Sequence, residues 1–250
     1  LPAVQVFIAF CLEKNLAIRF VGGCVRDTVM GRWVHNIAVR DIDVATTACP
    51  EAIIAACADT PYKALPTGIA HGTVTVIVHG QAFELTTLRI DALCDGRHAQ
   101  VQFTDDWEQD AKRRDFTLNA LMLSSEGRIY DYTGGLEDAR AGRIRFIGDP
   151  DARIREDYLR ILRFFRIYAT HGRVPLDEEA LNACQAAASK LETLSVERIA
   201  QEMQKLLTAS DPYQAVKLMA EYGVLSVLCP DATPQLAALQ QMQRVEQAAG

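Results

Sequence analysis

The stretch that decides the fold is Val39-Arg40-Asp41-Ile42-Asp43-Val44-Ala45-Thr46. Apolar residues alternate with two aspartates, which predicts a β-strand with Asp41 and Asp43 on the same face. Their Cα atoms would lie roughly 6–7 Å apart, given the rise of a strand. Two carboxylates this close repel each other unless a cation lies between them, and Mg²⁺ prefers such hard oxygen ligands. The pattern predicts a Mg²⁺ site, although two solvated aspartates at a strand end are its commoner origin.

A second motif lies upstream, in the run Phe20-Val21-Gly22-Gly23-Cys24-Val25-Arg26-Asp27. The run passes from a short apolar strand into a helical pattern. Gly22 and Gly23 let the backbone approach a ligand closely, and free N–H groups at a helix start favour an anion. Arg26 could hold phosphate through its planar guanidinium group. A phosphate-binding turn followed at short range by paired carboxylates is much less common than either feature alone.

The composition is that of an ordinary globular protein. The 250 residues are 49% hydrophobic and 23% charged, which fits one large or two small domains. No apolar run approaches the ~18–20 residues that span a bilayer, so we expect no membrane association. The first ten residues show no signal peptide, and the seven cysteines are scattered without a metal-binding spacing, so we expect a reducing, cytoplasmic location. The net charge of −6 argues against coating nucleic acid by bulk charge.

The order of elements predicts an α+β protein whose β-rich half is followed by a helical half. Strands are expected at 17–21, 39–45, 73–78, 82–87, 120–124 and 128–132, with a hairpin turn at 80–81 and a loop at 91–104. Helices are expected at 2–15, 50–58 and 105–112, and then at 152–170, 177–190, 195–208, 211–221 and 234–248. The change of pattern predicts two domains that divide near residues 138–150.

Two further groups of polar residues follow the paired aspartates. Glu84 lies in the second strand of the predicted hairpin, and it would be a third carboxylate if that hairpin lay beside the strand of Asp41 and Asp43. An outward-facing strand residue is an equally good interpretation. In the run 112–120, paired arginines precede Asp115 and Asn119, and this group could hold a ribose and its phosphates. A charged helix end is the simpler alternative.

The segment 139–173 contains nine arginines, no lysine and four acids, so nine minus four leaves a local charge of +5. Arginine without lysine favours bidentate or stacking contacts with phosphates and bases. Asp157 and Arg160 are three residues apart and would share one face of the helix at 152–170. Such a pair could accept from an exocyclic amine and donate to a ring acceptor, which selects C and A over U and G. An ordinary intrahelical salt bridge is the alternative.

Four of these runs carry a resemblance to a known family, class II tRNA nucleotidyltransferases. That family comprises the CCA-adding enzymes and the similar bacterial poly(A) polymerases, within the polymerase-β-like superfamily. The resemblance covers roughly residues 17–208 and keeps the family's motif order. The runs are Phe20–Asp27, Arg40–Thr46, Arg113–Ala120 and Glu156–Arg160, and Leu194–Ile199 with Glu202 fits the family's last motif.

The resemblance implies a fold and a set of roles. The expected domains are a nucleotidyltransferase head with a mixed sheet and helices at 1–138, an all-α neck at 139–208 and the start of a helical body at 209–250. Asp41 and Asp43 would be catalytic carboxylates that bind Mg²⁺, and Glu84 would be a third catalytic residue. The nucleotide-binding residues would be Gly22, Gly23 and Arg26 on the triphosphate, Arg114, Asp115 and Asn119 on the sugar and phosphates, Asp157 and Arg160 on the base, and Arg163 nearby.

The resemblance also implies a reaction. The run Arg89–His98 resembles the flexible loop of family members that add C, although Ala99 stands where proline is usual. We therefore expect complete CCA addition to the tRNA 3′ end, in which the terminal hydroxyl attacks the α-phosphate of CTP or ATP and pyrophosphate leaves. Poly(A) synthesis, addition of A or CC alone, and a non-catalytic RNA-binding relic remain the alternatives. The oligomeric state stays open.

Overall fold

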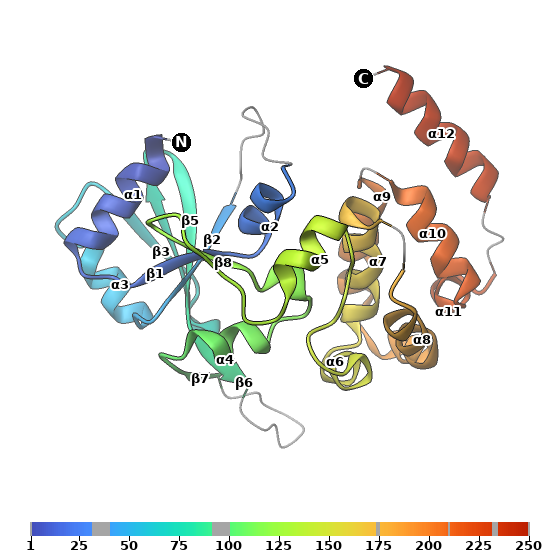
Figure 1. Ribbon diagram of the computed structural model, residues 1–250, viewed down its shortest axis with the longest axis horizontal. Helices are drawn as coiled ribbons and strands as arrows, with labels where there is room; N and C mark the ends of the chain where they lie inside the picture. Colours follow the sequence, from blue (N-terminus) through green and yellow to red (C-terminus); the bar gives the residue numbers. More distant parts are fainter. Residues whose placement is uncertain are drawn as a thin grey trace. The chain divides into compact units, whose positions relative to one another are not determined.

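The computed structural model describes residues 2–31, 41–91, 101–173, 176–209, 211–231 and 235–249. It divides the chain into two units, residues 1–137 and 138–250, each with its own core (Figure 1). The predicted strand residues 39 and 40, and most of the predicted loop at 91–104, lie outside the described residues.

The first unit is built on one mixed sheet. Within the described residues its strands follow the order β3-β4-β5-β2-β1-β8-β9, and β2 pairs with β5 in parallel. The other recorded pairings in this sheet are antiparallel. The strands are β1 (Ile18–Val21), β2 (Asp41–Thr46), β3 (Lys63–Gly68), β4 (Thr73–Val78), β5 (Gln81–Thr87), β8 (Met122–Ser124) and β9 (Ile129–Tyr130).

The alternating pattern of the central strands decides which face of the sheet is covered. Ile42 and Val44 of β2 are buried, whereas Asp43 between them is exposed. Phe83 of β5 is also buried and stacks on Phe7 of α1, with ring centroids 4.0 Å apart. The first-unit helices are α1 (Pro2–Glu13), α2 (Gly23–Val29), α3 (Pro50–Cys57) and α4 (Trp107–Lys112), with 3₁₀ turns at Ile69–His71 and Thr117–Asn119. The helices α1 and α3 pack against the sheet, and the carboxylate of Asp43 lies on the face away from Phe7.

The structure confirms the α+β fold class and the mixed sheet, and it corrects several elements. The strand β3 and the small helix α5 (Gly135–Ala141) were not expected. The prediction of a loop over 91–104 is wrong at its ends, because β6 (Arg89–Asp91) and β7 (Val101–Phe103) pair as an antiparallel ribbon. Neither strand has the length or the alternation that identifies a strand from sequence.

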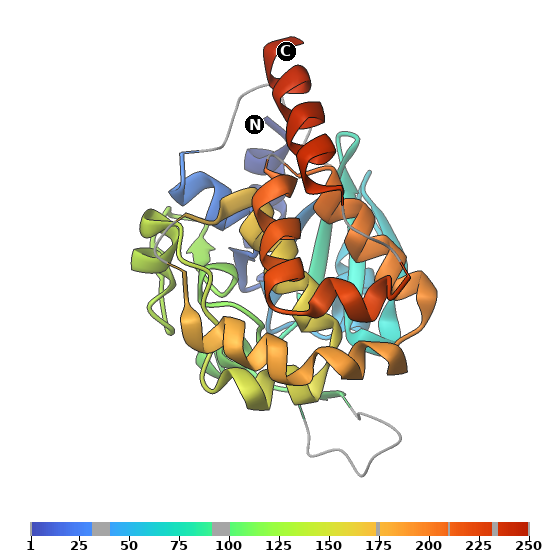
Figure 2. The ribbon, with the colours of Figure 1, turned by 90° about the vertical axis from the view of Figure 1, so that its right-hand side faces the viewer.

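The second unit is helical in its described part. The helix α7 (Leu159–His171) buries Ile161, Phe164 and Phe165 in the core, and it packs against α9 and α10 (Figure 2). The helices are α6 (Pro150–Glu156), α7 (Leu159–His171), α8 (Glu178–Ala187), α9 (Val196–Leu207), α10 (Pro212–Glu221), α11 (Val224–Leu228) and α12 (Leu236–Ala249), with a 3₁₀ segment at Ala188–Thr193.

The predicted single helix at 152–170 is wrong. It is divided into α6 and α7 at Asp157, whose backbone is extended with φ −155° and ψ 107°. The carboxylate of Asp157 accepts a hydrogen bond from the backbone N–H of Leu159 at 3.1 Å. An aspartate that bonds a nearby N–H in this way competes with the helical ladder and favours a new helix start. Asp157 and Arg160 therefore do not share a face of one helix.

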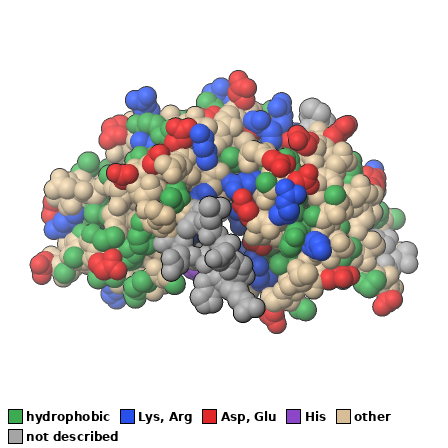
Figure 3. All heavy atoms as spheres, turned by 90° about the horizontal axis from the view of Figure 1, so that it is seen from below, with side chains coloured by type: hydrophobic (Ala, Val, Ile, Leu, Met, Phe, Trp, Pro, Cys, Tyr) green, Lys and Arg blue, Asp and Glu red, His purple; other side chains and the backbone are tan. Residues whose placement is uncertain are grey.

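The surface mixes both signs of charge. Acidic and basic side chains are interspersed on the face seen in Figure 3. In the described part of the chain, no helix is both long and apolar enough to cross a membrane.

Candidate functional site

Two carboxylates lie side by side because β2 and β5 pair in parallel. The register places Asp43 opposite Glu84, and it places the backbone of Asp41 opposite Ala82 in the same ladder. Asp43 is exposed and Glu84 is half-buried. The condition under which Glu84 was expected to join the aspartates, adjacency of the hairpin to their strand, is therefore met.

The glycine turn lies against this pair of acids. Gly22 has a φ of 76°, and a Cβ atom added there would lie 3.0 Å from Oδ2 of Asp43. Only a glycine leaves this space beside the carboxylate without strain. Among the side chains that the structure describes, no group of three His, Cys, Asp or Glu gathers as a metal site, and the Asp41 side chain is not among them. Exposed carboxylate oxygens next to an open glycine turn are a donor set that fits a hard divalent cation.

Replacing Gly22 by alanine is expected to cost more stability than the same change at Gly127. Both glycines have positive φ, 76° and 86°, so a side chain strains the backbone in both variants. Only at Gly22 does the added methyl group meet another atom within 4 Å, the carboxylate of Asp43. Chemical denaturation should show Gly22→Ala less stable than Gly127→Ala by at least about 1 kcal/mol. Equal losses would contradict the tight approach of Gly22 to Asp43.

The thiol beside the turn is neutral. Burial raises the pKa of Cys24 to about 12, and the nearby charge of Asp43 adds to the rise. The Cys24 thiol donates to the backbone oxygen of Val21 at 3.2 Å. Burial therefore disfavours the thiolate form of Cys24 at neutral pH.

A hydrogen-bond network joins three predicted site residues of the first unit. Nη1 of Arg26 donates to Oδ1 of Asn119 at 2.7 Å, and Nδ2 of Asn119 donates to Oδ1 of Asp115 at 3.3 Å. Nε of Arg26 also donates to Asp27 at 2.8 Å. Arg26 is only 9% exposed, so the network holds its guanidinium group in one place. It thereby ties the glycine-turn helix to the segment 115–119.

Asp110 of α4, which is 1% exposed, forms ion pairs with both Arg113 and Arg114. Oδ1 of Asp110 accepts from Nε and Nη2 of Arg113 at 2.9 and 2.7 Å, and Oδ2 accepts from Nε and Nη2 of Arg114 at 3.2 and 2.8 Å. Burial alone would raise the pKa of Asp110, but the charges of Arg114 and Arg113 and their hydrogen bonds hold it below its ordinary value. The stability from this carboxylate is present at neutral pH and is lost as pH falls through the lowered pKa.

In the second unit, the two predicted base-reading residues have different partners. Both carboxylate oxygens of Asp157 accept from Nη2 of Arg198 on α9, at 3.1 and 2.9 Å. Arg160 is paired with Glu156 and donates to the backbone oxygen of Arg153 at 2.9 Å. The alternative interpretation, a salt bridge between Asp157 and Arg160, is therefore wrong, because each side chain pairs with another residue. Arg160 and Arg163 are three residues apart on α7 and lie on neighbouring positions of that helix.

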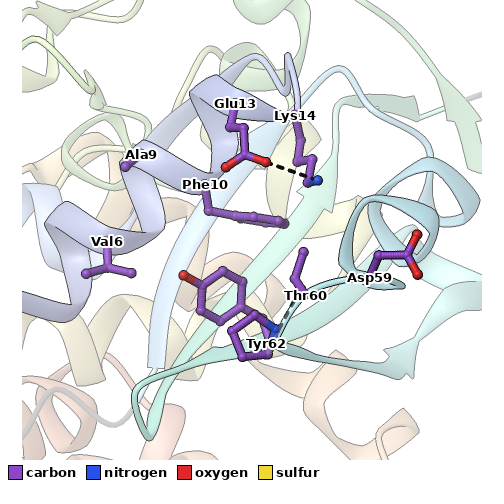
Figure 4. Close-up of a pocket in the computed structure, with 9 residues that line it drawn as sticks. Val6, Ala9, Phe10, Glu13, Lys14, Asp59, Thr60 and Tyr62 are labelled. Atoms are coloured by element: carbon purple, nitrogen blue, oxygen red, sulfur yellow. Dashed lines mark hydrogen bonds and ion pairs between the residues drawn. The ribbon is translucent and has the colours of Figure 1, made fainter.

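A pocket of about 390 Å³ lies elsewhere in the first unit, between α1 and the turn before β3 (Figure 4). Phe10 and Tyr62 meet edge to face in it, with centroids 5.1 Å apart, and Glu13 pairs with Lys14 at 3.2 Å. None of the predicted site residues lines this pocket. The candidate site is therefore the acid-bearing face of the sheet, together with the network that extends from it.

Three residues with clear contacts were not among the predicted site residues: Asp27, Asp110 and Arg198. Asp110 precedes Arg113 and Arg114 by three and four positions, so helical spacing alone could have identified it as their partner. Arg198 is far from Asp157 in sequence, and only the packing of α9 against α7 reveals that ion pair.

Two family models match the chain. Residues 18–145 match the model described as "Poly A polymerase head domain". Residues 174–236 match the model described as "Probable RNA and SrmB- binding site of polymerase A".

Curated relatives and solved structures agree with these matches. The chain is 40% identical over 223 residues to "CCA tRNA nucleotidyltransferase 1, mitochondrial" of Danio rerio, covering 88% of this chain and 51% of that protein. It is 38% identical over 211 residues to "CCA-adding enzyme" of Leuconostoc mesenteroides, covering 84% and 50%. A crystal structure of the Bacillus stearothermophilus CCA-adding enzyme in complex with CTP has a TM-score of 0.78 and 36% identity, over 89% of this chain and 52% of that one. The chain thus spans about half the length of these relatives.

Proposed function

Because the chain belongs to the family of the poly(A) polymerase head domain, we propose that it is a template-independent nucleotidyltransferase that adds CCA to tRNA 3′ ends. Its substrates would be CTP, ATP and the tRNA terminus. The relatives named CCA-adding enzymes and CCA tRNA nucleotidyltransferases support this choice of product. The structural observation that carries the proposal is the register of Asp43 with Glu84 beside Gly22.

The catalytic acids of the proposal are Asp41 and Asp43, with Glu84 beside them. Nucleotidyltransferases of this family generally use a divalent metal ion, and we propose Mg²⁺ held by Asp41 and Asp43. A bound Mg²⁺ would supply a Lewis acid that lowers the pKa of the attacking hydroxyl and neutralises phosphate charge. The 3′-hydroxyl attacks the α-phosphate in line with the departing pyrophosphate, and no covalent enzyme intermediate forms.

The remaining first-unit residues would position the nucleotide. Gly22 and Gly23 leave room for the triphosphate to approach the backbone, and Arg26 and Arg114 carry positive charge toward it. Asp115 and Asn119 would contact the sugar and phosphates. The hydrogen bonds from Arg26 to Asn119 and from Asn119 to Asp115 support a common site. Such positioning lowers the barrier mainly by holding the reactants in one geometry.

Base choice would lie with the second unit. We propose that Asp157 accepts from the exocyclic amine of cytosine or adenine while Arg160 donates to the ring acceptor, with Arg163 nearby on the nucleotide. The ion pair with Arg198 fixes the direction of the Asp157 carboxylate. Arg160 would exchange its present partner Glu156, which is 43% exposed, for the base.

A cytoplasmic location is part of the same proposal and rests on the scattered cysteines, which form no disulfide among those that the structure describes. The vertebrate relatives are named mitochondrial enzymes, whereas the bacterial ones carry no such name. Cell fractionation with an antibody to the chain tests the compartment.

A second candidate is a poly(A) polymerase, because the head model carries that name. One assay separates the candidates. The chain is incubated with Mg²⁺, all four nucleoside triphosphates and tRNA lacking its last three nucleotides, and the new 3′ ends are sequenced. Ends that stop at CCA support the proposal, and ends extended by A alone favour the polymerase. Both candidate functions would be overturned if the chain extends neither this tRNA nor a tRNA that ends in CC.

A further inference from the structure

We propose that Asp110 is a positioning residue for the nucleotide site, acting through Arg113 and Arg114. The proposal rests on the proposed function, since it assigns Arg114 to the nucleotide. Asp110 touches no reacting group itself. Its part is to hold two guanidinium groups in fixed directions, so that Arg114 meets the nucleotide already aligned.

The geometry divides the Asp110 carboxylate between the two arginines. Each oxygen accepts two N–H groups of one arginine, at distances from 2.7 to 3.2 Å, so neither oxygen is shared between the two side chains. Oδ1 also accepts from the backbone N–H of Arg89, the first residue of β6, at 3.2 Å. One side chain therefore joins α4, the following arginine pair and the β6–β7 ribbon.

Because Asp110 and its two arginine partners are largely buried, removal of the Asp110 carboxylate should change the direction of both guanidinium groups. Asp110 has a 1% exposed side chain, while Arg113 and Arg114 have 15% and 20%. Two guanidinium groups this close repel each other unless an anion lies between them. Without the carboxylate they would turn apart, and Arg114 would lose the direction in which the fold presents it. A displacement of about 1 Å in a positioning group costs up to a hundredfold in rate.

The test is Asp110→Asn, which keeps the shape but leaves one acceptor oxygen for two arginines. The 250-residue chain is titrated with CTP and ATP in the presence of Mg²⁺, and thermal unfolding is recorded in parallel. We expect the dissociation constant of both nucleotides to rise about tenfold or more. The matched control is Asp106→Asn, at the half-buried N-cap of the same helix α4, and its nucleotide affinity should match the wild type.

A double-mutant cycle separates positioning from a merely structural role. If Asp110 acts through Arg114, then Asp110→Asn should weaken binding by less than about twofold in an Arg114→Gln background. If Asp110→Asn weakens binding by the same factor in the Arg114→Gln background as in the wild type, the two residues act independently and the proposal is overturned. Should Asp110→Asn fail to fold, Asp110→Glu moves the carboxylate by one methylene group and is expected to weaken binding severalfold.

The outcomes also distinguish this inference from the proposed function. If the wild-type chain binds neither CTP nor ATP, the proposed function fails and the inference fails with it. If the wild type binds both nucleotides, and whichever Asp110 variant folds binds them equally well, only the inference is overturned.

Discussion

Replacing Asp43 by alanine is expected to lower kcat for nucleotide addition by about a thousandfold or more, which corresponds to roughly 4 kcal/mol of transition-state stabilisation. The reason is the position of this carboxylate, exposed on the sheet beside Glu84 and against the glycine turn. Removing Asp41 and Asp43 together should leave no measurable Mg²⁺-dependent incorporation of labelled CTP or ATP into tRNA lacking its 3′ end.

The same substitution should leave the chain folded, because Asp43 is exposed on the sheet surface and lies outside the buried core. Thermal denaturation of Asp43→Ala should therefore show one cooperative transition, as in the wild type. Glu51→Gln, on the exposed surface of α3, serves as the control and should keep full activity. A folded Asp43→Ala variant with more than a tenth of the wild-type kcat would contradict the proposed role.

Replacing Asp157 by alanine is expected to relax the choice of base. A bidentate contact to a base is worth about 1–3 kcal/mol of discrimination, so the preference for CTP and ATP over UTP and GTP should fall by a factor of roughly 5 to 150. The measurement is kcat/KM for each of the four nucleoside triphosphates with tRNA lacking its 3′ end.

The control for this experiment is Asp151→Asn, an exposed acid in the first turn of α6. It removes one negative charge close by in sequence without changing the ion pair to Arg198, so discrimination should stay at the wild-type level. Undiminished selection of C and A by folded Asp157→Ala would mean that the base is chosen by groups other than this side chain.

The local pattern of apolar and polar residues is sufficient to predict many of the strands and helices of the first unit. The alternation predicts a strand at 39–45, and the structure has β2 at Asp41–Thr46, with Ile42 and Val44 buried and Asp43 exposed. Short elements escaped prediction because three residues of β6 or β7 carry too little periodicity to be recognised. The order of the strands in the sheet could not be predicted from local sequence either, because the pairing of β2 with β5 joins residues about forty positions apart.

The helical unit shows where local pattern misleads. The apolar spacing across 152–170 favours one helix, and most of that segment is helical. The break at Asp157 arises because its side chain bonds the N–H of Leu159 and the guanidinium of Arg198 at the same time. The first contact is local, whereas the second depends on α9 packing against α7.

The class of the fold and the family could be predicted from the sequence, and the sequence also proposes the acids and glycines of the candidate site, because periodicity and motif spacing are properties of neighbouring residues. The tertiary structure alone decided that Glu84 lies beside Asp43, that Asp157 pairs with Arg198, and that Asp110 is buried between two arginines. These contacts depend on strand pairing, helix packing and burial. All three are settled by the free energy of the whole fold, which no local stretch of sequence contains.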